Sequence, residues 1–174
     1  MKIGFSWAYS VGKTTLADFT SERFNLPKLS EPVRSMDKKP SELSEEHLHL
    51  MQWMFAKMMM RQHVDNDDYV SDATIADTLA YSQTMPEYDT VLRQSKNAVR
   101  WMYDIVFYVP IEFPVTDDWF RHLDEKYREE INMKILDLHK ELWITPIEIR
   151  WTLEERKEAI INHVEAWMKS SAQR

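Results

Sequence analysis

Short apolar runs alternate with longer, half-polar segments along the whole chain. The run from Ile105 to Val109 is wholly apolar and ends at Pro110, which is typical of a strand buried on both faces of a parallel sheet. Shorter runs of the same character recur at intervals, each bounded by polar or turn-forming residues. The pattern predicts five strands, at residues 2–7, 29–33, 68–72, 104–109 and 143–149.

The segments between these strands carry helix signals. Ser44 is followed by two glutamates, the arrangement of an N-cap residue with an acidic first turn. Thr152 and Glu155 have the spacing of a capping box, in which two side chains and two main-chain N–H groups bond reciprocally. The pattern predicts helices at residues 13–24, 44–63, 74–81, 88–102, 118–142 and 152–169.

This alternation of strands and helices predicts an α/β fold. A helix between successive strands lets them run parallel, with helices covering both faces of the sheet. We expect residues 1–174 to form one domain, a three-layer α/β/α unit around a central parallel sheet of about five strands. No apolar run reaches the 18 residues of a membrane span, and the first residues read as a strand rather than as a signal peptide.

Composition narrows the classes of function. The chain has no cysteine, which excludes disulfides, thiolate catalysis and cysteine-based zinc sites and is compatible with a cytoplasmic setting. Its formal net charge is −7. Proteins that bind duplex DNA through many phosphates usually carry a basic face, so this charge disfavours DNA binding without excluding it. Only two glycines occur, Gly4 and Gly12, so we expect each to have a task in the backbone.

The segment between the first strand and the first helix resembles a Walker A loop, GxxxxGK[ST]. In such a loop main-chain N–H groups surround the β-phosphate, and the positive end of the following helix points at the same group. The resemblance implies ATP and Mg²⁺ as cofactors, with Lys13 neutralising the transferred phosphoryl group and the Thr14 hydroxyl binding Mg²⁺. The residues of this segment are Trp7, Ala8, Tyr9, Ser10, Val11, Gly12, Lys13, Thr14 and Thr15.

One position departs from the motif. Trp7 stands where the motif has its first glycine, so a bulky ring replaces a flexible residue at the exit of the strand. Gly12, Lys13 and Thr14 are retained, as is the strand–loop–helix context. We therefore keep the interpretation that the chain has a P-loop NTPase fold and binds a nucleotide.

Further segments resemble small kinases of nucleosides and nucleotides. Glu31-Pro32-Val33 follows the second predicted strand, where deoxynucleoside kinases carry a similar Glu-Pro-Val. In that family the glutamate accepts the proton of the acceptor hydroxyl, as general-base assistance requires. The resemblance implies that Glu31 is catalytic and that Glu31 and Arg34 bind the acceptor.

The predicted long helix carries the segment Met51-Gln52-Trp53-Met54-Phe55. The same kinases use a glutamine and aromatic residues of the corresponding helix to read and stack the acceptor base. The resemblance implies that Gln52, Trp53 and Phe55 bind the acceptor. Apolar residues at helical spacing are also what a plain core-facing helix carries, so this alternative stays open.

Asp72-Ala73-Thr74 follows the third predicted strand and resembles the acid–arginine–polar triplet of these kinases. The resemblance implies that Asp72 lies near Mg²⁺ or the acceptor, so we predict it as a catalytic residue, a metal ligand and an acceptor contact. Ala73 replaces an arginine that holds phosphate in the family, which weakens the case for a monophosphate acceptor and favours a hydroxyl one. Asp77 is a further candidate, although a carboxylate on a helix surface has the same pattern.

Residues 113–130 resemble the lid of compact P-loop kinase-like ATPases, a family that includes phage nucleotide kinases and the ribosylnicotinamide kinase domain. The resemblance implies that Arg121 is catalytic and binds the nucleotide, reaching the phosphates when the lid closes. Arg128 is the second candidate for this role, and its alternative is a helix-surface residue paired to Asp124.

Together these features predict a Mg²⁺-dependent enzyme that moves the γ-phosphoryl group of ATP to a nucleoside or nucleotide. One alternative keeps the chemistry and takes a 5-hydroxymethylated pyrimidine within DNA as the acceptor, as in phage DNA modification. A basic groove would support that alternative, formed by Lys38, Lys39, Arg61, Arg93, Lys96 and Arg100.

A third interpretation is a nucleotide-binding regulatory ATPase without a small acceptor. It requires that Glu31, Gln52 and Asp72 do not converge on one pocket. The sequence does not identify the acceptor base or sugar, and association of two copies through the Met- and Trp-rich helices also stays open.

Overall fold

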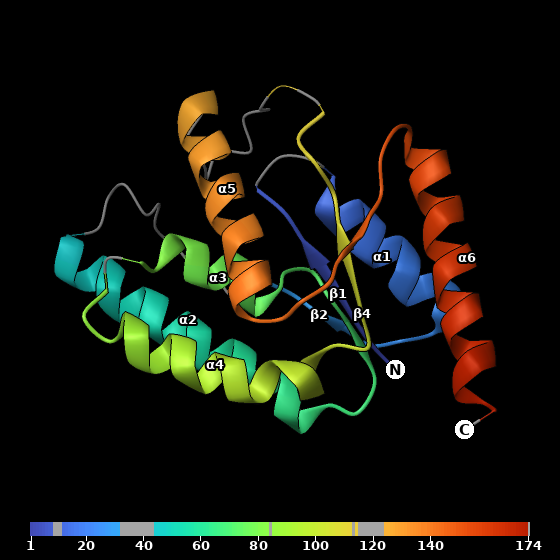
Figure 1. The fold of residues 1–174 in the computed structure, drawn as a ribbon, viewed down its shortest axis with the longest axis horizontal. Coiled ribbons are helices and arrows are strands. Elements are labelled where there is room, and N and C mark those ends of the chain that lie inside the picture. Colours follow the sequence, from blue (N-terminus) through green and yellow to red (C-terminus); the bar gives the residue numbers. More distant parts are fainter. Residues whose placement is uncertain (9–11, 32–43, 84, 113, 115–123, 174) are drawn as a thin grey trace.

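Five parallel strands form the centre of the fold (Figure 1). The computed structural model describes residues 1–8, 12–31, 44–83, 85–112, 114 and 124–173. In sheet order the strands are β2, β3, β1, β4 and β5, so the first strand of the chain lies in the middle. Their bounds are β1 (Lys2–Ser6), β2 (Lys28–Leu29), β3 (Tyr69–Ser71), β4 (Ile105–Tyr108) and β5 (Ile147–Glu148).

The described residues form six helices. These helices cover the two faces of the sheet (Figure 1). One layer holds α1 (Lys13–Phe24) and α6 (Leu153–Ser171). The other holds α2 (Glu45–Asp65), α3 (Ile75–Tyr81), α4 (Tyr88–Met102) and α5 (Glu125–Glu141). The predicted three-layer α/β/α fold is therefore confirmed. Within the described residues, no helix combines the length and the apolar content needed to cross a membrane.

Each layer has its own apolar core. The sheet residues Ile3, Phe5 and Phe107 pack with α1 and α6, and Trp7 joins this core with only 1% of its surface exposed. The helices of the other layer pack mainly against one another, through Met59, Leu79, Val91, Ile135 and Leu138. Because both faces of β1 are covered, the residues from Ile3 to Ser6 are all buried.

Several predicted element boundaries hold. Helix α4 begins and ends where the sequence pattern places it. Ser44 is the N-cap of α2 and accepts a hydrogen bond from the main-chain N–H of His47. Thr152 and Glu155 form the expected capping box at the start of α6.

The prediction for residues 143–149 is wrong in its first half. Trp143 adopts φ 57°, in the left-handed region, and ends α5. The N–H of Trp143 donates to the carbonyl of Lys140 (3.2 Å) and that of Ile144 to the carbonyl of His139 (2.9 Å), the bond pattern of a Schellman helix end. The apolar residues of this segment therefore close a helix, and β5 is only two residues long.

Two other predicted elements are shorter in the structure. The strand expected at residues 29–33 is β2, which ends at Leu29. The helix expected from residue 118 starts at Glu125, because the Asp124 carboxylate accepts the N–H groups of Lys126 and Tyr127 as an N-cap. Residues 118–123 of the expected helix lie outside the described residues.

Gly4 has the backbone task that its scarcity suggested. A Cβ atom at this position would lie 2.8 Å from Cδ1 of Tyr103 and 3.0 Å from Cγ2 of Thr74. Tyr103 cannot move aside freely, since its hydroxyl accepts the N–H of Ile75 at 2.9 Å. Glycine is therefore required here by close approach of two side chains to β1.

Three buried groups have shifted pKa values, and the shift of Asp77 affects stability in the opposite direction to those of the two histidines. Burial lowers the pKa of His63 to about 4, and it lowers the pKa of His139 to about 4 as well. Burial raises the pKa of Asp77 to about 6, although Lys13 and hydrogen bonds from Thr74, Ser6 and Trp7 act in the opposite direction.

We expect Gly4→Ala to destabilise the fold. The added methyl group overpacks a site that already holds Tyr103 and Thr74, which typically costs about 1–3 kcal/mol. Urea denaturation should show a lower midpoint with an unchanged slope. The double variant Gly4→Ala/Tyr103→Leu should lose less than the sum of the two single changes, and strict additivity would contradict the steric explanation.

We also expect stability to fall as the pH is lowered from about 6.5 to about 4. In this window the unfolded state binds protons at both histidines before the native state does, which favours unfolding by up to a few kcal/mol. Asp77 contributes in the opposite direction between about 3.8 and 6, but as one group against two. The free energy of unfolding, measured by urea titration at several pH values, should follow this slope.

The matched variant for the pH experiment is His63→Phe, which keeps a ring between Tyr69 and Tyr103 and removes one titrating group. Between about pH 6 and 4 its stability should depend on pH far less steeply than that of the wild type, because one histidine then remains against Asp77. An unchanged slope in this variant would contradict the assignment to His63.

Candidate active site

The start of α1 has a geometry that suits the binding of an anion. Gly12 is the N-cap of α1 and has φ 89°, a conformation that strains any other residue type. A glycine N-cap has no side chain to occupy the first N–H groups of the helix, so these groups and the helix dipole can face an anion. Phosphates of a nucleotide fit this arrangement.

Lys13, the first residue of α1, lies beside Glu31. The distance from Lys13 Nζ to Glu31 Oε2 is 3.3 Å, and Lys13 is only 6% exposed. Glu31 comes two residues after β2, at the same edge of the sheet as the end of β1. The structure thus brings together two of the predicted catalytic residues, one from each of two strand ends.

Thr14 and Asp72 form a second pair at this edge. The Thr14 hydroxyl donates to Asp72 Oδ2 at 3.2 Å, and Asp72 is completely buried directly after β3. A hydroxyl and a carboxylate are oxygen donors of the kind that Mg²⁺ prefers, and Mg²⁺ needs only one or two protein ligands when phosphates and water complete its shell. The two residues therefore fit the predicted metal site.

The predicted acceptor residues on α2 face different ways. Gln52 Nε2 donates to the carbonyl of Tyr81 at the end of α3 (2.7 Å), and Gln52 Oε1 is buried and accepts no hydrogen bond from the described residues. Trp53 is 37% exposed, with Lys57 Nζ 5.9 Å from its ring centre. Phe55 is half-buried. The described contacts of these residues do not include the Lys13–Glu31 pair, so their role in acceptor binding stays a prediction.

Some predicted site residues lie outside the described part of the chain. They are Tyr9, Ser10, Val11, Arg34 and Arg121. Of the expected lid at residues 113–130, the structure describes residue 114 and residues 124–130, and the latter form the N-cap and first turns of α5. Arg128 is completely buried and lies 3.3 Å from Glu125, so its interpretation as a surface residue is wrong.

Asp77 has several described hydrogen bonds near the phosphate loop (residues 7–15), although the sequence pattern gave it only a minor place. Its carboxylate is 2% exposed and accepts the hydroxyl of Ser6 at 2.7 Å and the N–H of Trp7 at 3.1 Å. It also accepts the N–H of Thr74 at 2.5 Å, as the capping box of α3. The helix-surface alternative for Asp77 is therefore wrong. The spacing of Thr74 and Asp77 was a capping signal, but the contacts to β1 join residues about 70 positions apart and leave no local trace in the sequence.

His139 of α5 completes this buried network. Its Nε2 lies 2.7 Å from Ser6 Oγ. The single Ser6 proton goes to Asp77, so His139 is the donor to Ser6 and carries its proton on Nε2. With its pKa near 4, His139 is neutral at neutral pH.

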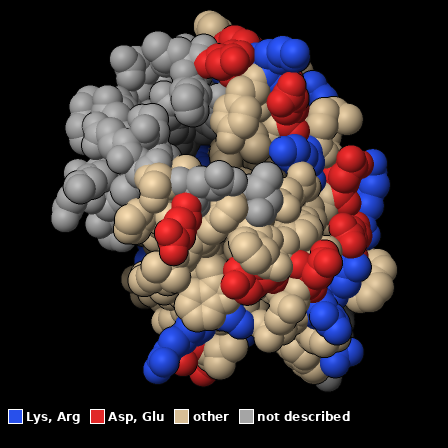
Figure 2. Space-filling view, turned by 90° about the vertical axis from the view of Figure 1, so that its left-hand side faces the viewer, with Lys and Arg blue, Asp and Glu red and all other residues tan. Residues whose placement is uncertain are grey.

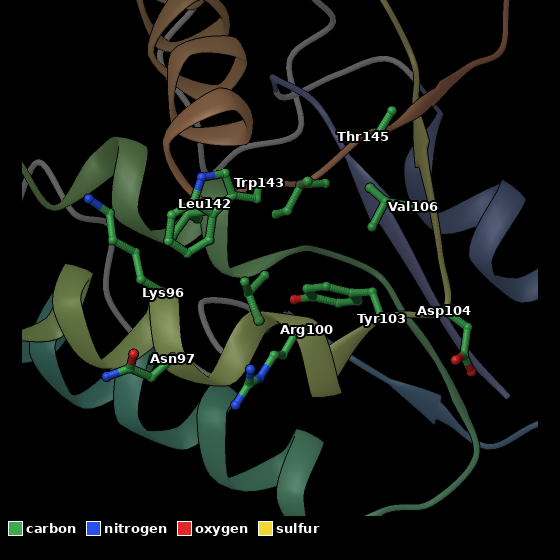
Figure 3. A pocket seen from close by; sticks show the side chains of 11 residues that line it. Lys96, Asn97, Arg100, Tyr103, Asp104, Val106, Leu142, Trp143 and Thr145 are labelled. Carbon is green, nitrogen blue, oxygen red and sulfur yellow. The ribbon is translucent and has the colours of Figure 1, made fainter.

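A separate cavity of about 460 Å³ lies at the opposite edge of the sheet, near the beginnings of β4 and β5. Figure 3 shows Lys96 and Trp143 on its helical side and Asp104 and Val106 on its strand side. Lys96 is paired with Glu141 at 2.9 Å, and the Asp104 carboxylate accepts the N–H of Lys2 at 2.7 Å. Its lining includes neither the Lys13–Glu31 pair nor the Thr14–Asp72 pair, so this cavity lies outside the candidate site.

Comparison with known proteins supports the same fold. The solved structures that resemble this chain include deoxyadenosine kinase from M. mycoides with bound dCTP, with a TM-score of 0.69 and 18% identity over 95% of this chain and 100% of that one. The NadR protein in complex with NR has a TM-score of 0.72 at 19% identity, over 95% of this chain and 51% of NadR. The YorR protein from Bacillus subtilis in complex with phosphorylated GDP has a TM-score of 0.56 at 16% identity, over 95% and 96%.

At such low identity these similarities establish the fold and leave the substrate open. No curated protein matches the chain by sequence. A family model described as an AAA domain matches residues 2–156, which is most of the chain. The chain therefore belongs to this AAA domain family, and its five-stranded parallel sheet has the P-loop kinase fold of deoxyadenosine kinase.

Proposed function

We propose that this protein is a Mg²⁺-dependent phosphotransferase that moves the γ-phosphoryl group of ATP to a nucleoside-type acceptor. The observation that carries the proposal is the meeting of two pairs at one sheet edge, Lys13 with Glu31 and Thr14 with Asp72. In open parallel sheets ligands bind outside the carboxyl ends of the strands, where the strand order reverses. Here β1 lies between β3 on one side and β4 on the other, so the strand order reverses at β1. The residues of both pairs come after the carboxyl ends of β1, β2 and β3.

Each residue of the two pairs has a role that its chemistry suits. The ammonium group of Lys13 neutralises negative charge on the transferred phosphoryl group, and burial strengthens this interaction because water screens it less. Glu31 orients the acceptor hydroxyl and takes up its proton. Thr14 and Asp72 hold Mg²⁺, which supplies charge neutralisation between the phosphates when it is bound.

The Lys13–Glu31 ion pair also has a consequence for binding. A phosphate that approaches Lys13 competes with the Glu31 carboxylate for the same ammonium group. Once Lys13 turns to the phosphate, Glu31 is released to contact a hydroxyl nearby. Binding of the donor and activation of the acceptor are in this way connected through one cation.

Two observations bear on the class of the acceptor, namely the shared fold and the residue at position 73. Deoxyadenosine kinase phosphorylates a nucleoside by its name, and we extend the nucleoside class to this chain on the strength of the shared fold. Ala73, which is buried beside Asp72, has no charge to offer an acceptor phosphate, and this favours a hydroxyl acceptor without one. Arg121 and Arg34 remain proposed phosphate and acceptor contacts.

DNA that carries a 5-hydroxymethylated pyrimidine is the alternative acceptor. Of the basic residues expected to form a groove for it, Arg61 bonds Asp65 at 3.1 Å and Lys96 bonds Glu141 at 2.9 Å. On the face in Figure 2, basic and acidic side chains are interspersed over the described surface. On this one face the described side chains form no continuous basic area, which favours a small acceptor over a DNA duplex. Lys38 and Lys39 of the expected groove lie outside the described residues.

An acceptor screen tests the proposal. Label transfer from ATP should occur to one of three groups of acceptors, namely free nucleosides, nucleoside monophosphates or hydroxymethylated DNA, and we expect it with nucleosides. Lys13→Ala should abolish transfer and weaken binding of a non-hydrolysable ATP analogue, because it removes the cation that faces the phosphates. ATP hydrolysis that no acceptor changes would instead favour a regulatory ATPase, and ATP binding that Lys13→Ala leaves unchanged would overturn the proposal.

Glu31→Gln separates general-base catalysis from simple ion pairing. If Glu31 takes up the acceptor proton, kcat should fall by about 10²–10⁴-fold. The dissociation constant of the ATP analogue should stay constant or decrease, since Lys13 no longer has to leave a carboxylate. Steady-state kinetics and calorimetry measure the two effects, and an unchanged kcat would assign Glu31 to charge balance alone.

A further inference from the structure

The Asp77 carboxylate divides its two oxygen atoms between two strands. Oδ1 accepts the Ser6 hydroxyl (2.7 Å) and the Trp7 N–H (3.1 Å), both at the exit of β1. Oδ2 accepts the N–H (2.5 Å) and the hydroxyl (3.1 Å) of Thr74, in the turn after β3. One side chain of α3 therefore bonds the residues that leave two neighbouring strands.

These two strand exits lead to the two proposed metal ligands. The chain passes from Trp7 through the phosphate loop to Thr14, and Thr74 comes two residues after Asp72. The Thr14 hydroxyl and Asp72 Oδ2 are 3.2 Å apart. Any shift between the exit of β1 and the turn after β3 would change that separation.

We propose that Asp77 is a positioning residue that clamps the exit of β1 to the turn after β3 and so sets the spacing of Thr14 and Asp72 for a Mg²⁺–nucleotide complex. This inference rests on the proposed function. Asp77 itself touches neither metal ligand in the described contacts, and acts through Trp7 and Thr74.

A carboxylate suits this task better than any neutral side chain. It presents two acceptor oxygens and no donor, and all four of its described partners are donors. Asparagine in the same place has one acceptor oxygen, so it satisfies the exit of β1 or the turn after β3 but leaves N–H facing N–H on the other side. The cost of burying the charge is offset by these bonds and by the nearby ammonium group of Lys13.

Trp7 is the residue through which Asp77 holds the start of the phosphate loop. The indole is packed in the core of α1 and α6, and the main-chain N–H of Trp7 donates to Asp77, so both the side chain and the backbone of the residue in place of the first motif glycine are held. The loop therefore starts from a rigid point. Ser6 and His139 extend the same network to α5 through the 2.7 Å contact between Ser6 Oγ and His139 Nε2.

The test compares the binding of a non-hydrolysable ATP analogue with and without Mg²⁺ by calorimetry. In the wild type, Mg²⁺ should tighten binding. In Asp77→Asn the gain from Mg²⁺ should shrink by roughly 10-fold, since one strand exit loses its acceptor and the two ligands lose their spacing. A merely structural role would lower the melting temperature and leave the ratio of the two dissociation constants unchanged.

Val91→Ala is the matched control, because Val91 of α4 is buried in the apolar core that α4 shares with α3 and is not among the described partners of Asp77. It should lower the melting temperature and keep the wild-type ratio. If Asp77→Asn does not fold, Ser6→Ala decides, since it removes one donor of Oδ1 and the connection to His139 and should reduce the Mg²⁺ gain by a smaller factor.

The outcomes separate the clamp from the proposed function. A wild-type ratio in the folded Asp77→Asn variant, or in Ser6→Ala where Asp77→Asn is unfolded, overturns the clamp alone. A wild type that does not bind the analogue overturns the proposed function, and the clamp with it.

Discussion

The parallel pairing of β1 with β3 brings the carboxyl ends of these two strands, and with them Thr14 and Asp72, to the same edge of the sheet. Ile3 is opposite Val70 of β3 and Ile105 of β4, so the three strands are in register at their beginnings. In a parallel sheet this register also aligns the strand exits at the other edge. Ser71, the last residue of β3, is opposite Gly4, so Asp72 emerges beside the last residues of β1 and at the same edge as the groups that follow Trp7.

Several charged side chains are buried at this edge of the sheet. Lys13, Asp72 and Asp77 are each at least nine-tenths buried, although such groups rarely lose contact with water without compensation. Each has a described partner of suitable polarity, namely Glu31, Thr14 and the exit of β1. A protein that maintains several buried charges in one place bears a cost in stability, and sites that handle ions are where such a cost is expected.

Local signals in the sequence were sufficient for most of the fold. The limits of α4 and the capping pairs of α2 and α6 follow from residues close to one another, so a local pattern contains them. The first residues of the phosphate loop and the Lys13–Thr14 pair were equally visible, because the loop is one continuous segment. The same local reasoning failed at Trp143, where an apolar run that resembles a strand closes a helix by a Schellman motif.

Contacts between distant residues were out of reach of such reasoning. The distance of 3.3 Å between Lys13 and Glu31 agrees with the expectation drawn from the family resemblance, although it tests no catalytic role. Asp77 shows the limit most clearly, since its capping spacing is local whereas its bonds to Ser6 and Trp7 depend on the order of strands in the sheet. Local sequence patterns therefore predict helix ends well. They do not predict a side chain that bonds two strands at once, because that contact depends on the order of the strands in the sheet.

The scarcity of glycine has a consequence for the unfolded chain. Four described residues have a positive φ, and only Gly12 among them is a glycine; the others are Asn25, Trp143 and Trp151. A left-handed conformation costs such residues about 1 kcal/mol or more in the native state. Each of them, however, restricts the denatured ensemble more than glycine would, and so reduces the conformational entropy lost on folding by a comparable amount. The cost of a positive φ in the native state is thus offset by a smaller conformational entropy of the denatured chain.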